Sequence, residues 1–149
     1  MNSTAIADII NNYKEQIDLY QLMLELARQQ LELVEKKLPA DNILAERHRL
    51  MEEINSLNQQ NHVWQEAFCQ AAGIQAFNLS RIKSMVNSAE IEELSQVLKE
   101  IAHVLQQIET VDKNIQDLLN QQLSSRNRPR ATLQRAQQAY KKDTPKPQA

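Results

Sequence analysis

The chain has 149 residues, which is enough for one domain with its own hydrophobic core. It holds one glycine and four prolines, and Gln, Glu, Leu, Ala and Lys dominate, a composition typical of long helices rather than of a β-rich or α/β fold. The net charge of −2 combines an acidic body, residues 1–124, with a basic segment, residues 125–149, and an acidic body disfavours nucleic acid as its partner.

Residues 5–38 show the spacing of one long amphipathic helix. The apolar stripe advances in steps of three and four over more than four heptads, as in a coiled coil. Its members are Ile6, Ile10, Tyr13, Ile17, Tyr20, Leu24, Ala27, Leu31, Val34 and Leu38. We expect Ser3 or Thr4 to cap this helix and Pro39 to end it, because the residue before a proline resists helical geometry.

A second helix is predicted to fold back antiparallel after the short connection at residues 39–41, with Asp41 as its N-cap. Its stripe is Ile43, Leu50, Ile54, Leu57, Asn61, Trp64, Phe68 and Ala71. Asn61 is polar at a core position, so it either fixes the register of the helices or lies at a wet edge of the bundle. We expect Trp64 and Phe68 to anchor the core rather than to bind a ligand.

The segment after residue 72 is expected to cross the end of the bundle. Gly73 suits the left-handed position just past a helix, and apolar residues then lead into a short helix near residues 79–86. Asn87 and Ser88 are a turn and cap for the next helix, whose first turn is rich in glutamate.

Residues 91–123 form the third long helix, with two apolar columns side by side. The first column is Leu94, Val97, Ile101, Val104, Ile108, Val111, Ile115 and Leu118; the second contains Leu98, Leu105 and Leu119. Such width predicts contact with more than one partner. The predicted fold is therefore all-α, a long antiparallel bundle of three long helices plus a short connecting helix. Residues 1–124 are the bundle, and residues 125–149 are a flexible, basic, Pro-containing tail.

The sequence indicates neither catalysis nor a metal or cofactor site. His48, His62 and His103 do not have metal-ligand spacing with one another or with Cys69, and no phosphate-binding or nucleophile motif occurs. Cys69 is the single cysteine, so we expect an inert, partly buried thiol in a cytoplasmic protein. Residues 1–4 lack the features of a secretory signal, and no apolar run approaches the ~18 residues of a membrane span.

The order of these features resembles the FlgN family of flagellar type III export chaperones over about residues 5–124. The resemblance rests on the long opening helix around Tyr20-Gln21-Leu22-Met23-Leu24-Glu25-Leu26, followed by the break Leu38-Pro39-Ala40-Asp41. The second helix then carries residues 46–54 and ends in Ala71-Ala72-Gly73-Ile74, and a short apolar crossing contains Leu79-Ser80-Arg81-Ile82. The last helix has Val111-Asp112-Lys113-Asn114 between its apolar residues.

The resemblance implies a cytoplasmic chaperone that holds the C-terminal amphipathic helices of hook-associated (hook–filament junction) proteins. Such a chaperone prevents premature assembly and delivers its client to the export gate and its ATPase machinery. In the family a tyrosine of the flexible C-terminal region contributes to docking at the gate, and Tyr140 is the only tyrosine of this tail.

We therefore expect a client helix to pack on the last helix. The expected binding residues are Leu98, Leu105, Val111, Leu118 and Leu119. The alternative is a structural coiled-coil scaffold, in which the same columns form a homo-oligomer; a homodimer of hairpins also fits the pattern.

Overall fold

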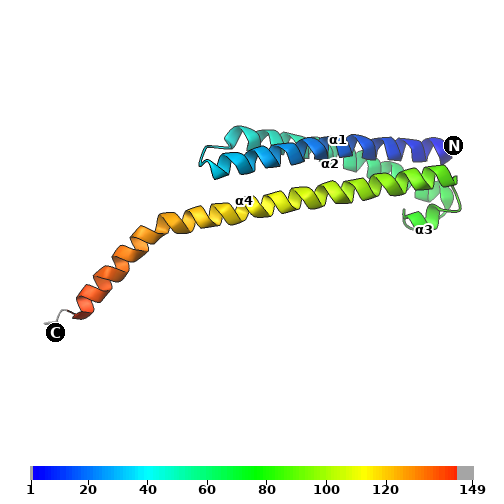
Figure 1. Cartoon of the computed structure of the whole chain (residues 1–149). Helices are drawn as coiled ribbons and strands as arrows, with labels where there is room; N and C mark the ends of the chain where they lie inside the picture. Colours follow the sequence, from blue (N-terminus) through cyan, green and yellow to red (C-terminus); the bar gives the residue numbers. More distant parts are fainter. Residues whose placement is uncertain (1, 144–149) are drawn as a thin grey trace.

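The computed structural model describes the backbone of residues 2–143 and the side chains of residues 5–124. It contains three long helices, α1 (Asn2–Glu35), α2 (Asp41–Ala72) and α4 (Ser88–Asp143), and the single-turn helix α3 (Leu79–Ile82). α1 and α2 form an antiparallel hairpin, and α4 runs along α1 in the same direction as α1 (Figure 1). The predicted all-α bundle of three long helices and a short connecting helix is confirmed.

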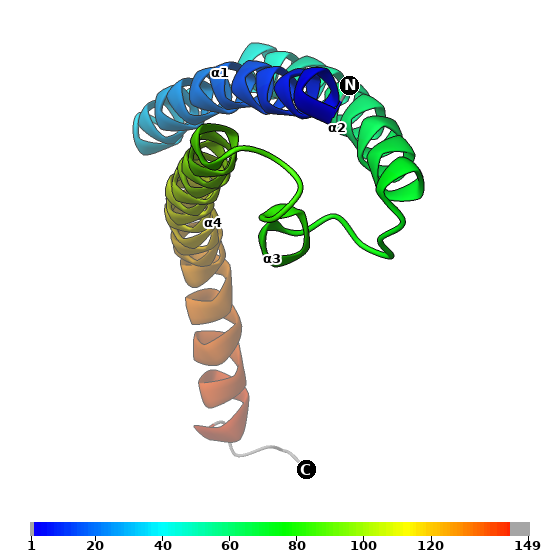
Figure 2. The same ribbon diagram turned by 90° about the vertical axis from the view of Figure 1, so that its right-hand side faces the viewer.

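α1 is the central helix of the bundle. It packs along both α2 and α4, whereas the backbones of α2 and α4 do not approach one another closely within the described residues. Figure 2 shows the consequence: α2 and α4 lie on different sides of α1, and α3 lies between the end of α2 and the start of α4. The two columns of α4 therefore do not reflect packing on two long helices, because α4 packs on α1 and on the short helix α3.

The core consists of two groups of buried residues along the bundle. The connector-end cluster draws on all four helices and contains Ile6, Ile9, Ile10, Ile17, Phe68, Ile82, Leu94 and Val97. The turn-end cluster, toward the α1–α2 turn, contains Met23, Leu24, Leu50, Ile54, Val104 and Ile108. Trp64 packs against the connector-end cluster, and the Phe68 ring meets the Phe77 ring edge-on at 5.7 Å, so the predicted aromatic anchor is confirmed.

A buried polar group fixes the register of α1 against α2. Asn61 is fully buried, and its Nδ2 donates to the Ile9 carbonyl at 3.1 Å and to Asn12 Oδ1 at 2.9 Å. Asn12 in turn donates to the Leu57 carbonyl at 2.9 Å. Because sliding the helices by one residue would leave these buried groups unpaired, Asn61 sets the register, and the alternative of a wet edge is wrong.

Three helix ends of the α1–α2 hairpin differ from the sequence predictions. α1 begins at Asn2, so Ser3 and Thr4 lie inside it rather than capping it. Its other end comes before Pro39, in a Schellman motif: Leu38 N–H donates to the Leu33 carbonyl and Lys37 N–H to the Val34 carbonyl. Lys37 takes the left-handed conformation there, at φ 59°. α2 has Ala40, not Asp41, at its N-cap, and no side chain caps it.

The connector follows the prediction closely. Gly73 ends α2 in the left-handed conformation, at φ 73°. α3 is shorter than the predicted segment 79–86, and Asn78 caps it by accepting from Arg81 N–H at 2.9 Å. Asn87 Oδ1 accepts from Glu90 N–H at 2.8 Å at the start of α4, which confirms the predicted cap.

α4 continues to Asp143, well past the end predicted near Ser124. Gln122 Nε2 donates to the Val34 carbonyl at 2.7 Å, close to the end of α1. The remaining orange part of α4 extends beyond the hairpin and bends away from it in Figure 1. Pro129 lies in this part and lacks the N–H that would continue the helical hydrogen bonds, which is the usual cause of a bend.

Candidate protein-binding face

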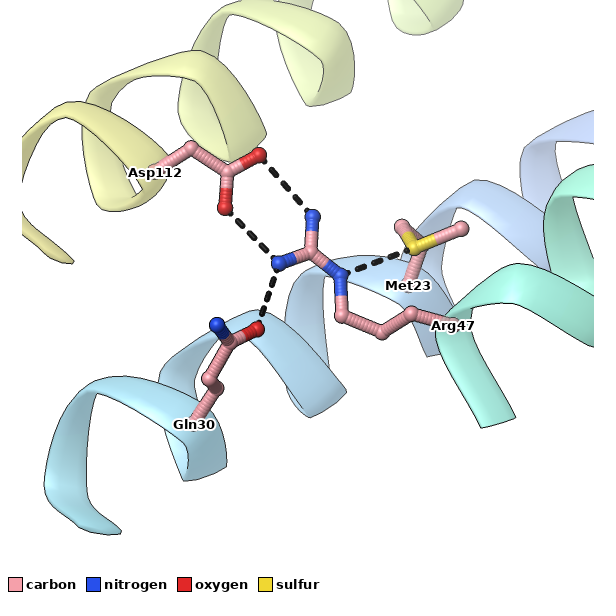
Figure 3. A network of polar contacts seen from close by, with 4 residues as sticks. All are labelled: Met23, Gln30, Arg47 and Asp112. Carbon is pink, nitrogen blue, oxygen red and sulfur yellow. Dashed lines mark hydrogen bonds and ion pairs between the residues drawn. The ribbon is translucent and has the colours of Figure 1, made fainter. Parts of the chain in front are cut away.

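An arginine–carboxylate pair joins α2 to α4 across α1, near the turn of the hairpin (Figure 3). Arg47 Nη1 donates to Asp112 Oδ1 at 2.8 Å, and Nη2 donates to Asp112 Oδ2 at 2.9 Å. This bidentate geometry is the strongest form of such a pair. Among the side chains that the structure describes, it is the polar link between α2 and α4.

The hairpin itself holds Arg47 in place. Its Nη1 also donates to Gln30 Oε1 at 2.7 Å, and its Nε lies 3.2 Å from Met23 Sδ, both on α1. Gln30 and Met23 are buried, and the Arg47 side chain keeps only 16% of its surface exposed, against 44% for Asp112. The α1–α2 hairpin therefore holds the guanidinium, and Asp112 reaches it from a more exposed position on α4.

Exposed apolar side chains flank this pair on both helices. Leu44 and Met51 lie one turn before and one turn after Arg47 on α2, and both are exposed. Leu105 and Leu119 lie one heptad before and after Asp112 on α4, with 40% and 41% of their surfaces exposed, and Leu123 follows with 58%. We call these five apolar residues, together with Arg47 and Asp112, the turn-end face.

The five residues expected to bind a client occupy two sides of α4. Leu98, Leu105 and Leu119 share the column that contains Asp112 and flanks the α1 contact on the side of α2. Val111 and Leu118 lie on the opposite flank and are half-buried, with Val111 packed against the turn-end cluster. Leu98 is also half-buried, against the connector-end cluster, so Leu105 and Leu119 are the two with substantial exposure.

Sequence reasoning missed the α2 side of this face and its central pair. A signal for Asp112 was present, because it interrupts an otherwise leucine column at residues 98, 105, 112 and 119. No comparable signal marks Arg47, since its partner is 65 residues away and the pairing depends on how three helices assemble. Tyr140, expected to dock at the export gate, lies outside the residues whose side chains are described.

The other chemistry-bearing residues form no second site within the described part of the chain. His48, His62 and His103 are exposed there, and no group of three His, Cys, Asp or Glu side chains is placed to hold a metal. Cys69 is half-buried, and burial, with the nearby Glu66 charge, raises the pKa of its thiol. On the exposed side of α2, hydrogen bonding to Arg49 lowers the pKa of Glu46.

The comparisons with known proteins give no identification. No family model matches the chain, and neither a curated relative nor a similar solved structure was found. None of the described helices combines the length and apolar character needed to cross a membrane.

Proposed function

We propose that this protein is a cytoplasmic chaperone of the FlgN type, which binds C-terminal amphipathic helices of hook-associated flagellar proteins and delivers them to the export gate. The proposal rests on the resemblance in the order of helices and breaks, and on one structural observation. That observation is the turn-end face, where exposed apolar residues lie one turn from Arg47 on α2 and one heptad from its partner Asp112 on α4.

The face has the chemistry that an amphipathic helix requires. Burying an apolar side chain contributes roughly 25 cal/mol per Å² of surface removed from water, and Leu44, Met51, Leu105, Leu119 and Leu123 all retain such surface. An exposed apolar group of this kind on a folded domain is typical of a site for a protein partner. A client helix would shield its own apolar stripe there and so remain unassembled.

A pull-down from the source cell tests the proposal directly. We expect hook-associated subunits to co-purify with the chain, and the Leu105→Ser/Leu119→Ser double variant to lose them while retaining its helicity. The matched control is Leu22→Ser/Val63→Ser, which alters two apolar residues that are more exposed than Leu105 and Leu119 and do not belong to the turn-end face. Recovery of the subunits by the Leu105→Ser/Leu119→Ser variant would place the client site elsewhere.

The alternative is a coiled-coil scaffold that uses the same exposed leucines to form a homo-oligomer. It differs in one measurable respect. A scaffold forms a stable oligomer whose mass, measured by light scattering, depends on Leu105 and Leu119 and is unchanged by hook-associated subunits. A monomer that binds those subunits excludes it.

A further inference from the structure

We infer that Arg47 is a receptor for a carboxylate on the partner helix and that Asp112 occupies this receptor in the free protein. The partner is then an amphipathic helix with an Asp or Glu between its apolar residues, lying along the turn-end face. This inference rests on the proposed function in taking the occupant to be a helix of another protein, and it adds the chemistry by which that helix is selected.

Arg47 is held in place by the α1–α2 hairpin, independently of α4. Its contacts with Gln30 and Met23 are made within the hairpin, so the guanidinium keeps its position whether or not Asp112 is engaged. A guanidinium has five N–H groups, and four of them are used by Met23, Gln30 and the two Asp112 oxygens. The fifth, on Nη2, has no acceptor among the described protein groups, which leaves it for an incoming carboxylate.

The two partners of the pair differ in exposure. Asp112 is nearly half exposed and can turn toward water at little cost, whereas Arg47 is largely buried. A buried cation left without a carboxylate is strongly unfavourable, so any state in which Asp112 moves away requires a replacement. A neutral helix cannot supply one, and a basic helix would be repelled.

Exposed apolar residues surround the pair. Leu44 and Met51 on one helix, and Leu105 and Leu119 on the other, place apolar surface on both sides of the charge along the bundle. An apolar–acidic–apolar helix would therefore meet matching chemistry along its length. The leucine column of α4 is itself an example of that pattern, with Asp112 at its centre.

Binding of a labelled synthetic peptide to the full-length protein tests the inference. The peptide copies residues 98–123, which carry the apolar–acidic–apolar pattern, and a second peptide differs only in the Asp112→Asn change. The protein is the Asp112→Asn variant, in which Arg47 has lost its internal carboxylate. We expect the peptide with the aspartate to bind about tenfold or more tightly than the peptide with the asparagine, the usual effect of a hydrogen bond to a charged group.

Two further variants make the result specific. Arg47→Gln should abolish the difference between the peptides, and Arg47→Lys, which retains the charge but loses the bidentate geometry, should reduce it and serves if Arg47→Gln fails to fold. Asp117→Asn is the matched control on α4, because Asp117 is exposed and forms no ion pair among the described residues; it should leave peptide binding as in the unaltered protein.

The outcomes separate this inference from the proposed function. Equal binding of the two peptides, binding of neither, or a preference that survives Arg47→Gln overturns it. So does dimerisation of the Asp112→Asn variant without peptide binding, which would assign the face to a second copy of the chain. Hook-associated subunits that bind equally to the unaltered protein and to Arg47→Gln would overturn the carboxylate receptor while supporting the proposed function.

Discussion

The two ends of the bundle differ in what lies between α2 and α4, although the same long helices form both. At the connector end, α3 lies between α2 and α4, and all four helices contribute to one buried cluster. At the turn end, only α1 lies between α2 and α4, and the two outer helices meet through the Arg47–Asp112 pair. Apolar side chains remain exposed there. The comparison shows that a short connecting helix can cover apolar side chains at one end of a bundle, while the other end, although it has a buried cluster of its own, leaves some of them exposed.

The largest expected effect is at the connector end. Leu94→Ala removes a fully buried side chain that four helices enclose, so we expect a loss of about 2–5 kcal/mol in the free energy of unfolding, measured by urea denaturation. Leu105→Ala, on the turn-end face, should cost no more than about 0.5 kcal/mol. Equal costs for the two substitutions would contradict the division between the ends.

The polar group between α1 and α2 gives the next effect. Asn61→Ala leaves the Asn12 side chain and the Ile9 carbonyl without a buried donor, so we expect about 1–3 kcal/mol of destabilisation. Asn58→Ala is the control, because Asn58 is exposed one turn earlier on the same helix. A cost for Asn61→Ala no larger than for Asn58→Ala would show that the register depends on apolar packing alone.

We expect the Arg47–Asp112 pair to contribute less to the free energy of unfolding than either Leu94 or Asn61. A double-mutant cycle with Arg47→Gln and Asp112→Asn should give a coupling of about 0.5–2 kcal/mol, reduced because Asp112 is 44% exposed. In hydrogen exchange, both variants should lose protection around residues 104–119 of α4 and not around residues 91–97. Loss of protection at both ends alike would mean that the bundle opens as one unit.

Lys37→Gly should stabilise the hairpin turn by about 0.5–1 kcal/mol. Lys37 adopts the left-handed conformation at φ 59°. This conformation is unfavourable for a residue with a Cβ atom and is not unfavourable for glycine. Thermal unfolding checks the prediction, with Lys36→Gly as the control at a neighbouring position of ordinary backbone geometry. A lower melting temperature for Lys37→Gly would show that the lysine side chain contributes more than the backbone strain costs.

The smallest effect is a dependence of stability on alkaline pH. Burial raises the pKa of Tyr13 above its ordinary value of 10.0, against a smaller lowering by its hydrogen bond from Gln65. The unfolded chain therefore releases this proton first, and stability that is present below pH 10 is lost as the pH rises beyond it. Denaturation at increasing pH should show the loss, and Tyr13→Phe should diminish it. Tyr20, whose pKa burial also raises, accounts for part of what remains.

Much of the fold could be predicted from the helical spacing of apolar residues and from the residues that end helices. The steps of three and four, Pro39 and Gly73 were enough to predict three long helices, their order and the crossing segment, because helix formation and termination are largely local. Local rules also placed some helix ends at the wrong residues, where no tertiary contact requires the predicted end. Asp41 has the right side chain for an N-cap and does not act as one, and α1 ends before Pro39 because Lys37 adopts the turn conformation.

The candidate site was less accessible to sequence reasoning. Leu105 and Leu119 could be named from their column, but Leu98, Val111 and Leu118 belong to the same apolar pattern and prove half-buried. A heptad pattern identifies which side chains share a face, and it does not identify which face another helix covers. Whether a leucine of α4 lies in the core or on an exposed face depends on where α1 packs against that helix.

Apolar periodicity, helix-ending residues and charge were enough to predict the helices, their apolar columns and the acidic body with its basic C-terminal segment. Only the assembled fold shows that α1, and not the helix with the widest apolar stripe, is the element on which both α2 and α4 pack. It also decided that Asn61 meets Ile9 and Asn12, and that Arg47 meets Asp112. The physical reason is that periodicity is a property of each helix alone, whereas register and partnership depend on burying polar groups with their partners across 49 to 65 residues of chain.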